Sequence, residues 1–418
     1  MYRRVLAALS VFCFSALLAV GSSAQNSPEV TVVSQRAGAL AEIMTEIEKN
    51  SFYKLSEKEL NDVQECIAAR AFIGFEIKKD ALKGDLKVPS CFPQDKRAMY
   101  FSPEVTRDLG EARVGHFGGI GMSIGPDKEM RGVVIKELFE GAPAERDGRL
   151  KAGDLITAAA DFVEGRELKL VPFKGFDTRK AASVMRGEPG TIVVLEVWRD
   201  GQKLPLIAIT REDVKIKNVK ASETSPGIGY LKIDSFDSFS VATDVWDALW
   251  NFKNKGIKKV IVDLRKNGGG LMNAAIGIAS LFAPEEGVLV LEARWRGQKA
   301  GEGQKYPAME IGFFYGFEVA VLIDGLSASA SEILAGSLKI WGAKIVGVKS
   351  YGKGSIQTQR SLSDGGTFSF TTGLYYLADG KTPEDGGIEP HFVIEDDPRT
   401  PEVDEALAVA VGILMDSK

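Results

Sequence analysis

The fold of this chain is decided by a stretch that runs Leu326-Ser-Ala-Ser-Ala-Ser-Glu-Ile333 and resumes as Ser350-Tyr-Gly-Lys-Gly-Ser-Ile-Gln357. The apolar run Val319–Ile323 before the serines predicts a buried strand. A helical pattern follows as far as Trp341, and another short apolar strand, Ile345–Gly347, comes next. This alternation predicts an α/β unit, whose ligand sites usually lie at the carboxyl ends of the strands.

The serine cluster offers a nucleophile at a strand-to-helix turn. Free amides at the start of a helix stabilise negative charge, so the amide of Ala330 is a candidate oxyanion donor. Composition alone does not choose among Ser327, Ser329 and Ser331. A competing interpretation makes Ser329-Ala-Ser-Glu332 a capping box, in which the hydroxyl only bonds a backbone amide.

A base for such a serine is scarce, because the chain has only two histidines, His116 and His391, for which we expect surface or structural roles. Lys353, between two glycines, is the substitute. A free lysine has a pKa of about 10.4 and is a poor base, but burial lowers the pKa of an ammonium group. If this segment is a strand, Gln357 lies on the same face and could hold the amine toward the serine. An exposed turn lysine is the alternative.

Two glycine-rich segments flank this chemistry. The turn Asn267-Gly-Gly-Gly270 follows the buried strand Lys259–Arg265, and glycines let the backbone approach closely, so one of its amides could donate to the oxyanion. The spacing Gly347-x-x-x-x-Gly352-Lys353 approaches a phosphate-binding loop, but Gly354 stands where Ser or Thr would hold magnesium. We reject ATP binding and expect no cofactor.

Residues from about 115 to 212 differ from their surroundings, with short strands, turns and two short helices. Phe117-Gly-Gly-Ile-Gly-Met-Ser-Ile124 is a glycine loop that runs into an alternating strand, and Gly141-Ala-Pro-Ala and Leu150-Lys-Ala-Gly-Asp follow. The order of elements and these segments resemble a PDZ domain. The loop Gly119, Ile120, Gly121 and Met122 would then bind the terminal carboxylate of a peptide, which adds to the adjoining strand edge.

The N-terminus predicts export. Arg3 and Arg4 precede an apolar run, and small residues follow, so we expect a cleavable signal peptide over residues 1–24, cut after Ala24, and a periplasmic or otherwise exported protein. Removal of the signal leaves Cys66 and Cys91, which in an oxidising compartment predict one disulfide, with two buried free thiols as the alternative. The region around them predicts helices that serve packing or dimerisation, without chemistry of their own.

The composition excludes several classes of function. A net charge of −5 and a pI near 5.5 argue against nucleic acid as a partner, because phosphate binding needs a basic face. A zinc site is not expected, since structural zinc requires four clustered Cys or His ligands. A hydrophobic content of 44% predicts ordinary globular cores.

Five motifs in order resemble the carboxyl-terminal processing peptidases, or tail-specific proteases, of the S41 serine peptidases. These are Gly229-Tyr-Leu-Lys-Ile, Val262-Asp-Leu-Arg-Lys-Asn-Gly-Gly, the serine cluster, Tyr-Gly-Lys-Gly-Ser-Ile-Gln357 and Gly387-Ile-Glu-Pro390. The resemblance covers nearly all of the chain after the signal. It implies a multidomain α+β and α/β fold: a helical N-terminal region (25–110), a PDZ domain (111–212), a crotonase-like (ClpP/crotonase) αβ peptidase core (213–398) and a C-terminal helix (399–418).

The resemblance also implies peptide-bond hydrolysis through an acyl-enzyme, at or near the C-termini of protein substrates. It implies that the PDZ domain engages these C-termini and gates the peptidase site. The family's catalytic positions fall on the nucleophile Ser329, the general base Lys353, its support Gln357, and oxyanion amides at Ala330 and at Gly269 or Gly270. No metal belongs to this mechanism. An adaptor or activator protein and self-association are further expected partners.

Three departures from the family pattern keep other functions open. The segment between nucleophile and lysine is one residue shorter than usual, His391 stands where aspartate is common, and Phe75–Gln94 resembles an insertion. A catalytically silent or partner-activated PDZ scaffold is therefore the main alternative. A crotonase-like acyl-transfer enzyme is another, although it would leave the PDZ-like region unexplained.

Overall fold

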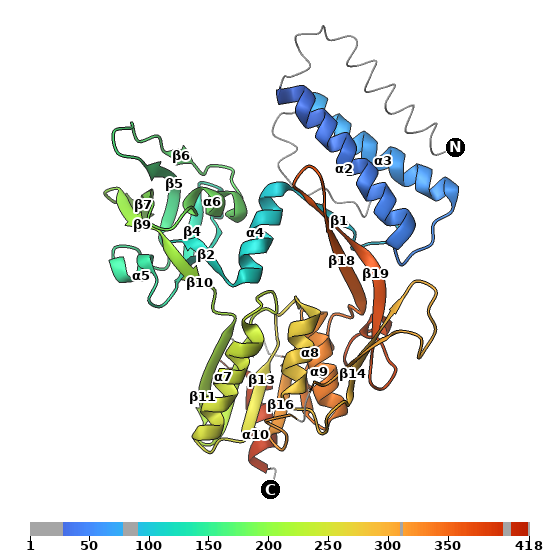
Figure 1. Cartoon of the computed structure of the whole chain (residues 1–418). Coiled ribbons are helices and arrows are strands. Elements are labelled where there is room, and N and C mark those ends of the chain that lie inside the picture. Colours follow the sequence, from blue (N-terminus) through green and yellow to red (C-terminus); the bar gives the residue numbers. More distant parts are fainter. Residues whose placement is uncertain (1–27, 78–90, 310–311, 396–402, 417–418) are drawn as a thin grey trace. The chain divides into compact units, whose positions relative to one another are not determined.

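The computed structural model describes residues 28–77, 91–309, 312–395 and 403–416. The chain divides into two compact units, which Figure 1 shows. Residues 1–110 and 218–418 form one, here called the core unit, and Glu111–Lys217 form the other, the inserted unit. The predicted signal peptide and its cleavage after Ala24 lie outside the described residues.

A six-stranded sheet forms the centre of the core unit. Its order is β11-β12-β13-β16-β17-β20, and all neighbours are parallel except β11 and β12. The strands are β11 (Val219–Ser225), β12 (Ile228–Ile233), β13 (Lys259–Asp263), β16 (Glu318–Ile323), β17 (Lys344–Gly347) and β20 (Phe392–Val393). The apolar runs of β13 and β16 suit strands that are covered on both faces.

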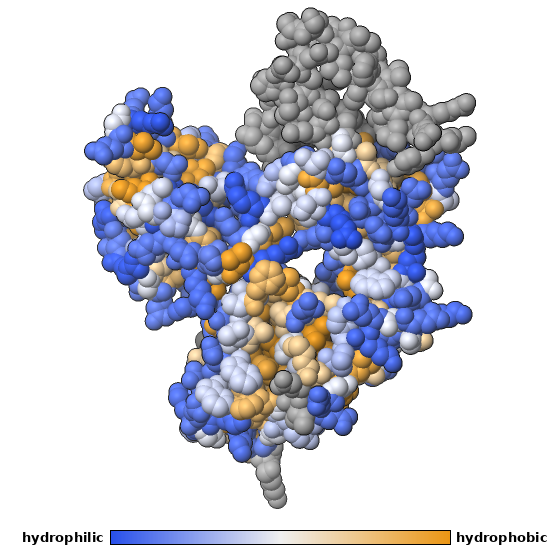
Figure 2. Space-filling view, viewed as in Figure 1, coloured by the Kyte–Doolittle hydropathy of each residue, from blue (hydrophilic) through white to orange (hydrophobic). Residues whose placement is uncertain are grey.

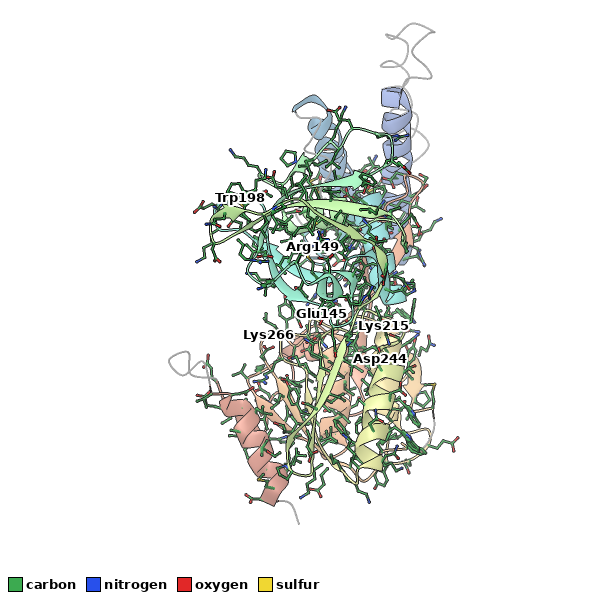
Figure 3. All side chains as sticks on the ribbon, turned by 90° about the vertical axis from the view of Figure 1, so that its left-hand side faces the viewer. Glu145, Arg149, Trp198, Lys215, Asp244 and Lys266 are labelled. Carbon is green, nitrogen blue, oxygen red and sulfur yellow. A yellow bond between two sulfur atoms is a disulfide. The ribbon has the colours of Figure 1, made fainter. Side chains whose placement is uncertain are left out.

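Helices cover both faces of this sheet. One face packs against α7 (Val241–Asn254), α8 (Met272–Ser280) and α9 (Ala330–Ile340), and the other packs against α10 (Glu405–Asp416). Side chains alternate along a strand, so Val321 faces the three helices while its neighbours Ala320 and Leu322 face α10. Figure 3, turned from the view of Figure 1, shows α7 and α10 on opposite sides of the sheet.

A second, antiparallel sheet lies beside the first. Its order is β1-β19-β14-β15, and β18 also pairs with the long β19. The strands are β1 (Met99–Phe101), β14 (Leu289–Trp295), β15 (Gln304–Pro307), β18 (Ser355–Ser361) and β19 (Thr367–Leu377). A 3-10 turn, η2 (Pro383–Asp385), follows β19.

The N-terminal helices α2 (Pro28–Asn50) and α3 (Glu57–Ile77) pack onto β19. Leu40 and Ile47 of α2 share a buried cluster with Phe368 and Phe370 of β19. Cys66 of α3 forms a disulfide with Cys91, so the predicted bridge is confirmed. Residues 78–90 lie outside the described part, and residues 91–96 form turns.

The inserted unit has the architecture of a PDZ domain. Its central sheet joins β3 (Met122–Pro126), β4 (Val133–Leu138), β5 (Leu155–Phe162), β6 (Val171–Pro172), β7 (Ile192–Arg199), β8 (Gln202–Lys203) and β9 (Ile207–Thr210). A two-stranded sheet pairs β2 (His116–Gly119) with β10 (Glu212–Lys215). The helices are α4 (Pro103–Val114), which leads into the unit, α5 (Pro143–Asp147) and α6 (Thr178–Met185). This arrangement confirms the predicted layout of two short helices among short strands.

Apolar side chains also reach the surface of the core unit. Figure 2 shows orange residues over the region of α7 and α8. Two exposed aromatic residues of this unit, Trp250 and Phe313, have rings that lie 5.2 Å apart and pack against half-buried Trp246. These aromatic residues therefore cover one another in part.

Replacing both bridged cysteines by serine (Cys66→Ser, Cys91→Ser) should lower the free energy of unfolding of the core unit by about 3 kcal/mol. The bridge joins residues 25 apart and restricts the unfolded chain accordingly. Urea denaturation followed by far-UV circular dichroism measures the change. Wild-type protein in reducing agent is the matched control and should unfold with the variant; equal midpoints for oxidised wild type and variant would contradict this role.

Candidate active site

Ser329 lies at the turn between β16 and α9, in an unusual backbone conformation. It is the N-cap of α9 with φ 56° and ψ −113°, a region that non-glycine residues rarely adopt. Such strained residues persist only where their surroundings hold them, and they cluster at functional sites. Ser329 is partly exposed, whereas Ala330, the first residue of the helix, is fully buried.

The other two serines of the cluster have structural partners. The Ser327 hydroxyl donates to the carbonyl of Leu264 at 2.9 Å, and the Ser331 hydroxyl donates to the carbonyl of Asn267 at 2.9 Å. Both side chains are completely buried. The fold thus distinguishes three serines that composition left equivalent, and Ser329 alone sits at the strained turn.

Glu332 connects this turn to the lysine segment. Its side chain is completely buried, and one oxygen, Oε2, accepts from the backbone amides of Ser329 and Lys353, each at 2.8 Å. The other oxygen accepts from the Ser350 hydroxyl at 2.6 Å and the Gly352 amide at 2.8 Å. A buried carboxylate is costly unless it is hydrogen-bonded, and these four donors supply that need. The sequence indicated Glu332 only as a capping residue.

Lys353 lies in the loop before β18, so the condition under which it would share a strand face with Gln357 is not met: β18 begins at Ser355 and its pairing shifts between Ile356 and Gln357. The side chain is half buried, and its amine makes no hydrogen bond or ion pair with any described residue. Burial lowers the pKa of Lys353, and the charge of Arg97 lowers it further, against opposing effects of Glu332, Glu384 and Asp237. A lowered pKa is what a lysine base needs at moderate pH.

The lysine loop is also held from its far side. The Gly354 amide donates to Glu384 Oε2 at 2.8 Å, and the other oxygen of Glu384 pairs with Arg97 at 2.7 Å. The hydroxyl of buried Tyr375 lies 2.9 Å from the Lys353 carbonyl and 3.1 Å from the Ser329 carbonyl. Burial raises the pKa of this phenol well above its usual value, which keeps it a neutral donor.

The glycine turn after β13 touches the serine turn. A Cβ added at Gly269 would lie 2.8 Å from Cβ of Ser329, so only glycine fits there. The Gly269 amide donates to Asn267 Oδ1 at 2.9 Å, whereas the amides of Gly270 and Ala330 have no hydrogen-bond partner in the described part of the chain. Unpaired backbone donors on two turns that touch each other are suited to an oxyanion.

The histidines take other roles. The His116 ring pairs with Asp213 at 2.6 Å in the inserted unit. His391 accepts from the Ile345 amide at 3.0 Å, and burial lowers the pKa of its ring. Asp263 pairs with Arg265, which reaches Asp404 just before α10, so this pair connects the sheet to the start of that helix.

The predicted carboxylate loop lines a groove of about 290 Å³ in the inserted unit. The loop leads from β2 into β3, and the groove is also lined by Ala182 and Met185 of helix α6 and by Arg186, the residue after that helix. The loop residues that line the groove are Gly119, Ile120, Gly121 and Met122. A larger hollow of about 500 Å³ lies elsewhere on this unit, but its Arg131 already pairs with Asp127. Trp198, which lines it, is labelled in Figure 3.

No group of three or more His, Cys, Asp or Glu among the described residues could hold a metal ion. Within the same residues, no helix combines the length and apolar character that a membrane crossing needs.

Comparison with known proteins identifies the family. The peptidase family S41 matches residues 227–394, and the PDZ domain matches residues 111–197. A carboxy-terminal-processing protease of Bartonella bacilliformis is 32% identical over 307 residues, which cover 72% of this chain and 67% of that protein. The chain belongs to peptidase family S41. The predicted family and fold class, with a helical N-terminal region, a PDZ domain and an S41 core, are therefore confirmed.

Other members of the S41 family are more distant. A CtpA-like serine protease of Staphylococcus aureus is 28% identical over 303 residues, and this chain spans only 58% of its length. The crystal structure of a protein described as an S41 protease from Bacteroides fragilis has a TM-score of 0.51 and 16% identity, over 90% of this chain and 97% of that one. This likeness supports the fold alone.

Changing Glu332 to Gln should disrupt the site. The side-chain NH₂ group of the glutamine would face N–H or O–H donors that now bond to a carboxylate oxygen. We therefore expect a loss of stability of about 2 kcal/mol and at least a tenfold loss of any Ser329-dependent activity. Thermal unfolding and peptide hydrolysis measure the two effects. The control is Glu389→Gln, at an exposed carboxylate that pairs with Lys349; a Glu332→Gln protein that behaved like this control would refute the role of Glu332.

Proposed function

We propose that this protein is an exported serine endopeptidase that cleaves protein substrates at or near their C-termini, with Ser329 as nucleophile and Lys353 as general base. One observation carries the proposal: a single buried carboxylate, that of Glu332, holds both the strained Ser329 and the loop of Lys353. Membership in the S41 family and the lowered pKa of Lys353 support it.

In this mechanism the neutral Lys353 amine takes the proton from the Ser329 hydroxyl as its oxygen attacks the carbonyl carbon of the scissile bond. The amides of Ala330 and Gly270 donate to the oxyanion that forms; Gly270 is preferred to Gly269, whose amide already donates to Asn267. The lysine then gives its proton to the leaving amine, and an acyl-enzyme remains. Water, deprotonated by the same lysine, hydrolyses the ester and restores Ser329.

The PDZ domain has a separate task in this proposal. Its groove between the glycine loop and α6 binds the C-terminal tail of a substrate, and tail binding gates the peptidase site. Export is supported by the N-terminal basic and apolar residues and by the Cys66–Cys91 bridge, since disulfides persist in oxidising compartments.

A second candidate is a silent or partner-activated enzyme, in which an adaptor completes the site. The observation in its favour is that the Lys353 amine has no hydrogen-bond partner among the described residues, so the base is not yet engaged in this state.

Ser329→Ala and Lys353→Ala should each reduce cleavage of an unfolded protein with an apolar C-terminus by at least a thousandfold, while tail binding is retained. Intact-mass analysis of the products measures cleavage and locates the cut. Because Lys353 acts in its neutral form and its folded-state pKa is lowered, kcat/KM should rise with pH and level off below the pH at which a free lysine loses its proton.

Lys353→Arg is the matched control, since arginine stays protonated and should be inactive at every pH. A Lys353→Ala enzyme that cut at the wild-type rate would show that Lys353 is not the general base. Absence of products from the wild type as well as from Ser329→Ala would favour the silent or partner-activated alternative.

Gly121→Ala should weaken tail binding at least tenfold. Gly121 has φ +77°, and an added Cβ would lie 2.1 Å from Cβ of Ala142, so the carboxylate loop must shift. Fluorescence anisotropy with a labelled C-terminal peptide measures the affinity. Gly165→Ala is the control, because it has the same φ of +77° but open space around the added Cβ. Equal affinities for the two variants would exclude the loop as the tail site.

A further inference from the structure

A chain of hydrogen bonds runs from Gln357 through Thr371 to Asp95, in the N-terminal region of the core unit. The Gln357 amide nitrogen donates to the Thr371 hydroxyl at 2.7 Å, and that hydroxyl donates to Asp95 Oδ1 at 2.9 Å. Gln357 and Thr371 face each other directly on β18 and β19, and Asp95 lies just before β1, which pairs with the other edge of β19. Figure 1 shows these three strands side by side.

This connection has a fixed direction. A carboxylate can only accept hydrogen bonds, so Asp95 requires Thr371 to donate its single hydroxyl hydrogen. The Thr371 oxygen must then act as an acceptor toward Gln357, which presents its nitrogen. The two ends of a glutamine amide are almost equal in size, so shape alone would not choose between them. The charge of Asp95 therefore decides which end of Gln357 faces away from Thr371.

The end that faces away is an unpaired acceptor. Gln357 Oε1 is buried and has no hydrogen-bond partner among the residues that the structure describes, although buried polar atoms of this kind are rare. The Lys353 amine, four residues earlier, likewise lacks a described partner and is the kind of donor that such an oxygen needs. If this oxygen is the acceptor for the amine, an inverted glutamine would instead present two N–H groups to it and occupy the lone pair with which the amine takes a proton.

We propose that Asp95 and Thr371 are positioning residues that orient the Gln357 amide, so that Oε1 receives the Lys353 amine and the nitrogen lone pair points to the nucleophile. This inference rests on the proposed role of Lys353 as the base. It assigns the N-terminal region a part in the chemistry that the sequence did not indicate.

The Asp95 carboxylate is itself firmly placed. Its side chain is 1% exposed, Oδ2 accepts from the Thr371 amide at 2.7 Å, and Oδ1 also accepts from the Arg97 amide at 3.0 Å. Cys91, four residues before it, is bridged to α3. The same short segment supplies Arg97, whose partner Glu384 holds the Gly354 amide, so it supports the lysine loop as well.

Thr371→Val tests the proposal, because valine keeps the volume of threonine and removes the hydroxyl. We expect kcat for peptide hydrolysis to fall about tenfold with KM unchanged, as one oriented hydrogen bond is lost. Thr371→Ser keeps the hydroxyl and should restore at least half of the activity. Thr372→Val is the matched control: it removes the neighbouring hydroxyl of β19, which pairs with Thr358 at 2.7 Å, and should change kcat less than twofold.

Double variants separate positioning from simple support of the fold. Thr371→Val should have no further effect on kcat in a Gln357→Ala background, because both changes remove the same contribution. Asp95→Asn should lower kcat in the wild-type background but not in the Thr371→Val background, although it lowers the melting temperature in both. Additive losses of kcat would overturn the proposal and show that these residues only stabilise the sheet.

The inference and the proposed function can fail separately. If Gln357→Ala is impaired while Thr371→Val cleaves at the wild-type rate, only the positioning role is wrong. If Gln357→Ala itself cleaves at the wild-type rate, glutamine has no role in catalysis and the inference falls, whereas the proposed function falls only if Ser329→Ala or Lys353→Ala cleaves at that rate.

An NMR measurement tests the orientation of Gln357 even if the wild-type protein has no peptidase activity. The side-chain amide resonances of ¹⁵N-labelled glutamine, with Gln357 assigned through Gln357→Ala, should shift in Thr371→Val and Asp95→Asn but not in Thr372→Val. An unshifted Gln357 signal in Thr371→Val would overturn the proposed orientation.

Discussion

The site depends on one buried carboxylate. Glu332 has no contact with solvent, and its two oxygens accept from four donors that come from the serine turn and the lysine loop. Because a buried charge without partners would cost several kcal/mol, the two segments cannot separate without a large loss of stability. Glu332 is also three residues after Ser329 on α9, so the strained serine, the start of the helix and the lysine loop are held as one rigid group.

Strand β19 extends this rigidity to distant parts of the chain. It pairs with β1, β14 and β18, and it receives the N-terminal helices through Phe368 and Phe370. Thr371 on this strand meets both Gln357 and Asp95, and Tyr375 meets both the serine turn and the lysine loop. The segment near Cys91 therefore connects the helical N-terminal region to residues around the proposed base.

Much of the molecule could be predicted from local patterns. Apolar runs such as Val319–Ile323 determine buried strands wherever they lie, and five motifs in order are specific enough to indicate the S41 family. The pairing of Cys66 with Cys91 followed from their being the two cysteines left after the predicted signal. Local patterns left open whether Lys353 lies on a strand; it precedes β18, since Gly352 and Gly354 allow a loop that reaches back to Glu332 and Glu384.

The sequence by itself determined the family, the order of elements and the residue types available for chemistry, because these follow from short-range periodicity and motif spacing. Only the tertiary structure distinguished Ser329 from Ser327 and Ser331, and Gly270 from Gly269, since the difference lies in which hydroxyls and amides already have partners. It alone brought Asp95 within hydrogen-bonding distance of Thr371, 276 residues away. A hydrogen bond depends on distance in space, and no spacing along the chain encodes a contact between segments so far apart.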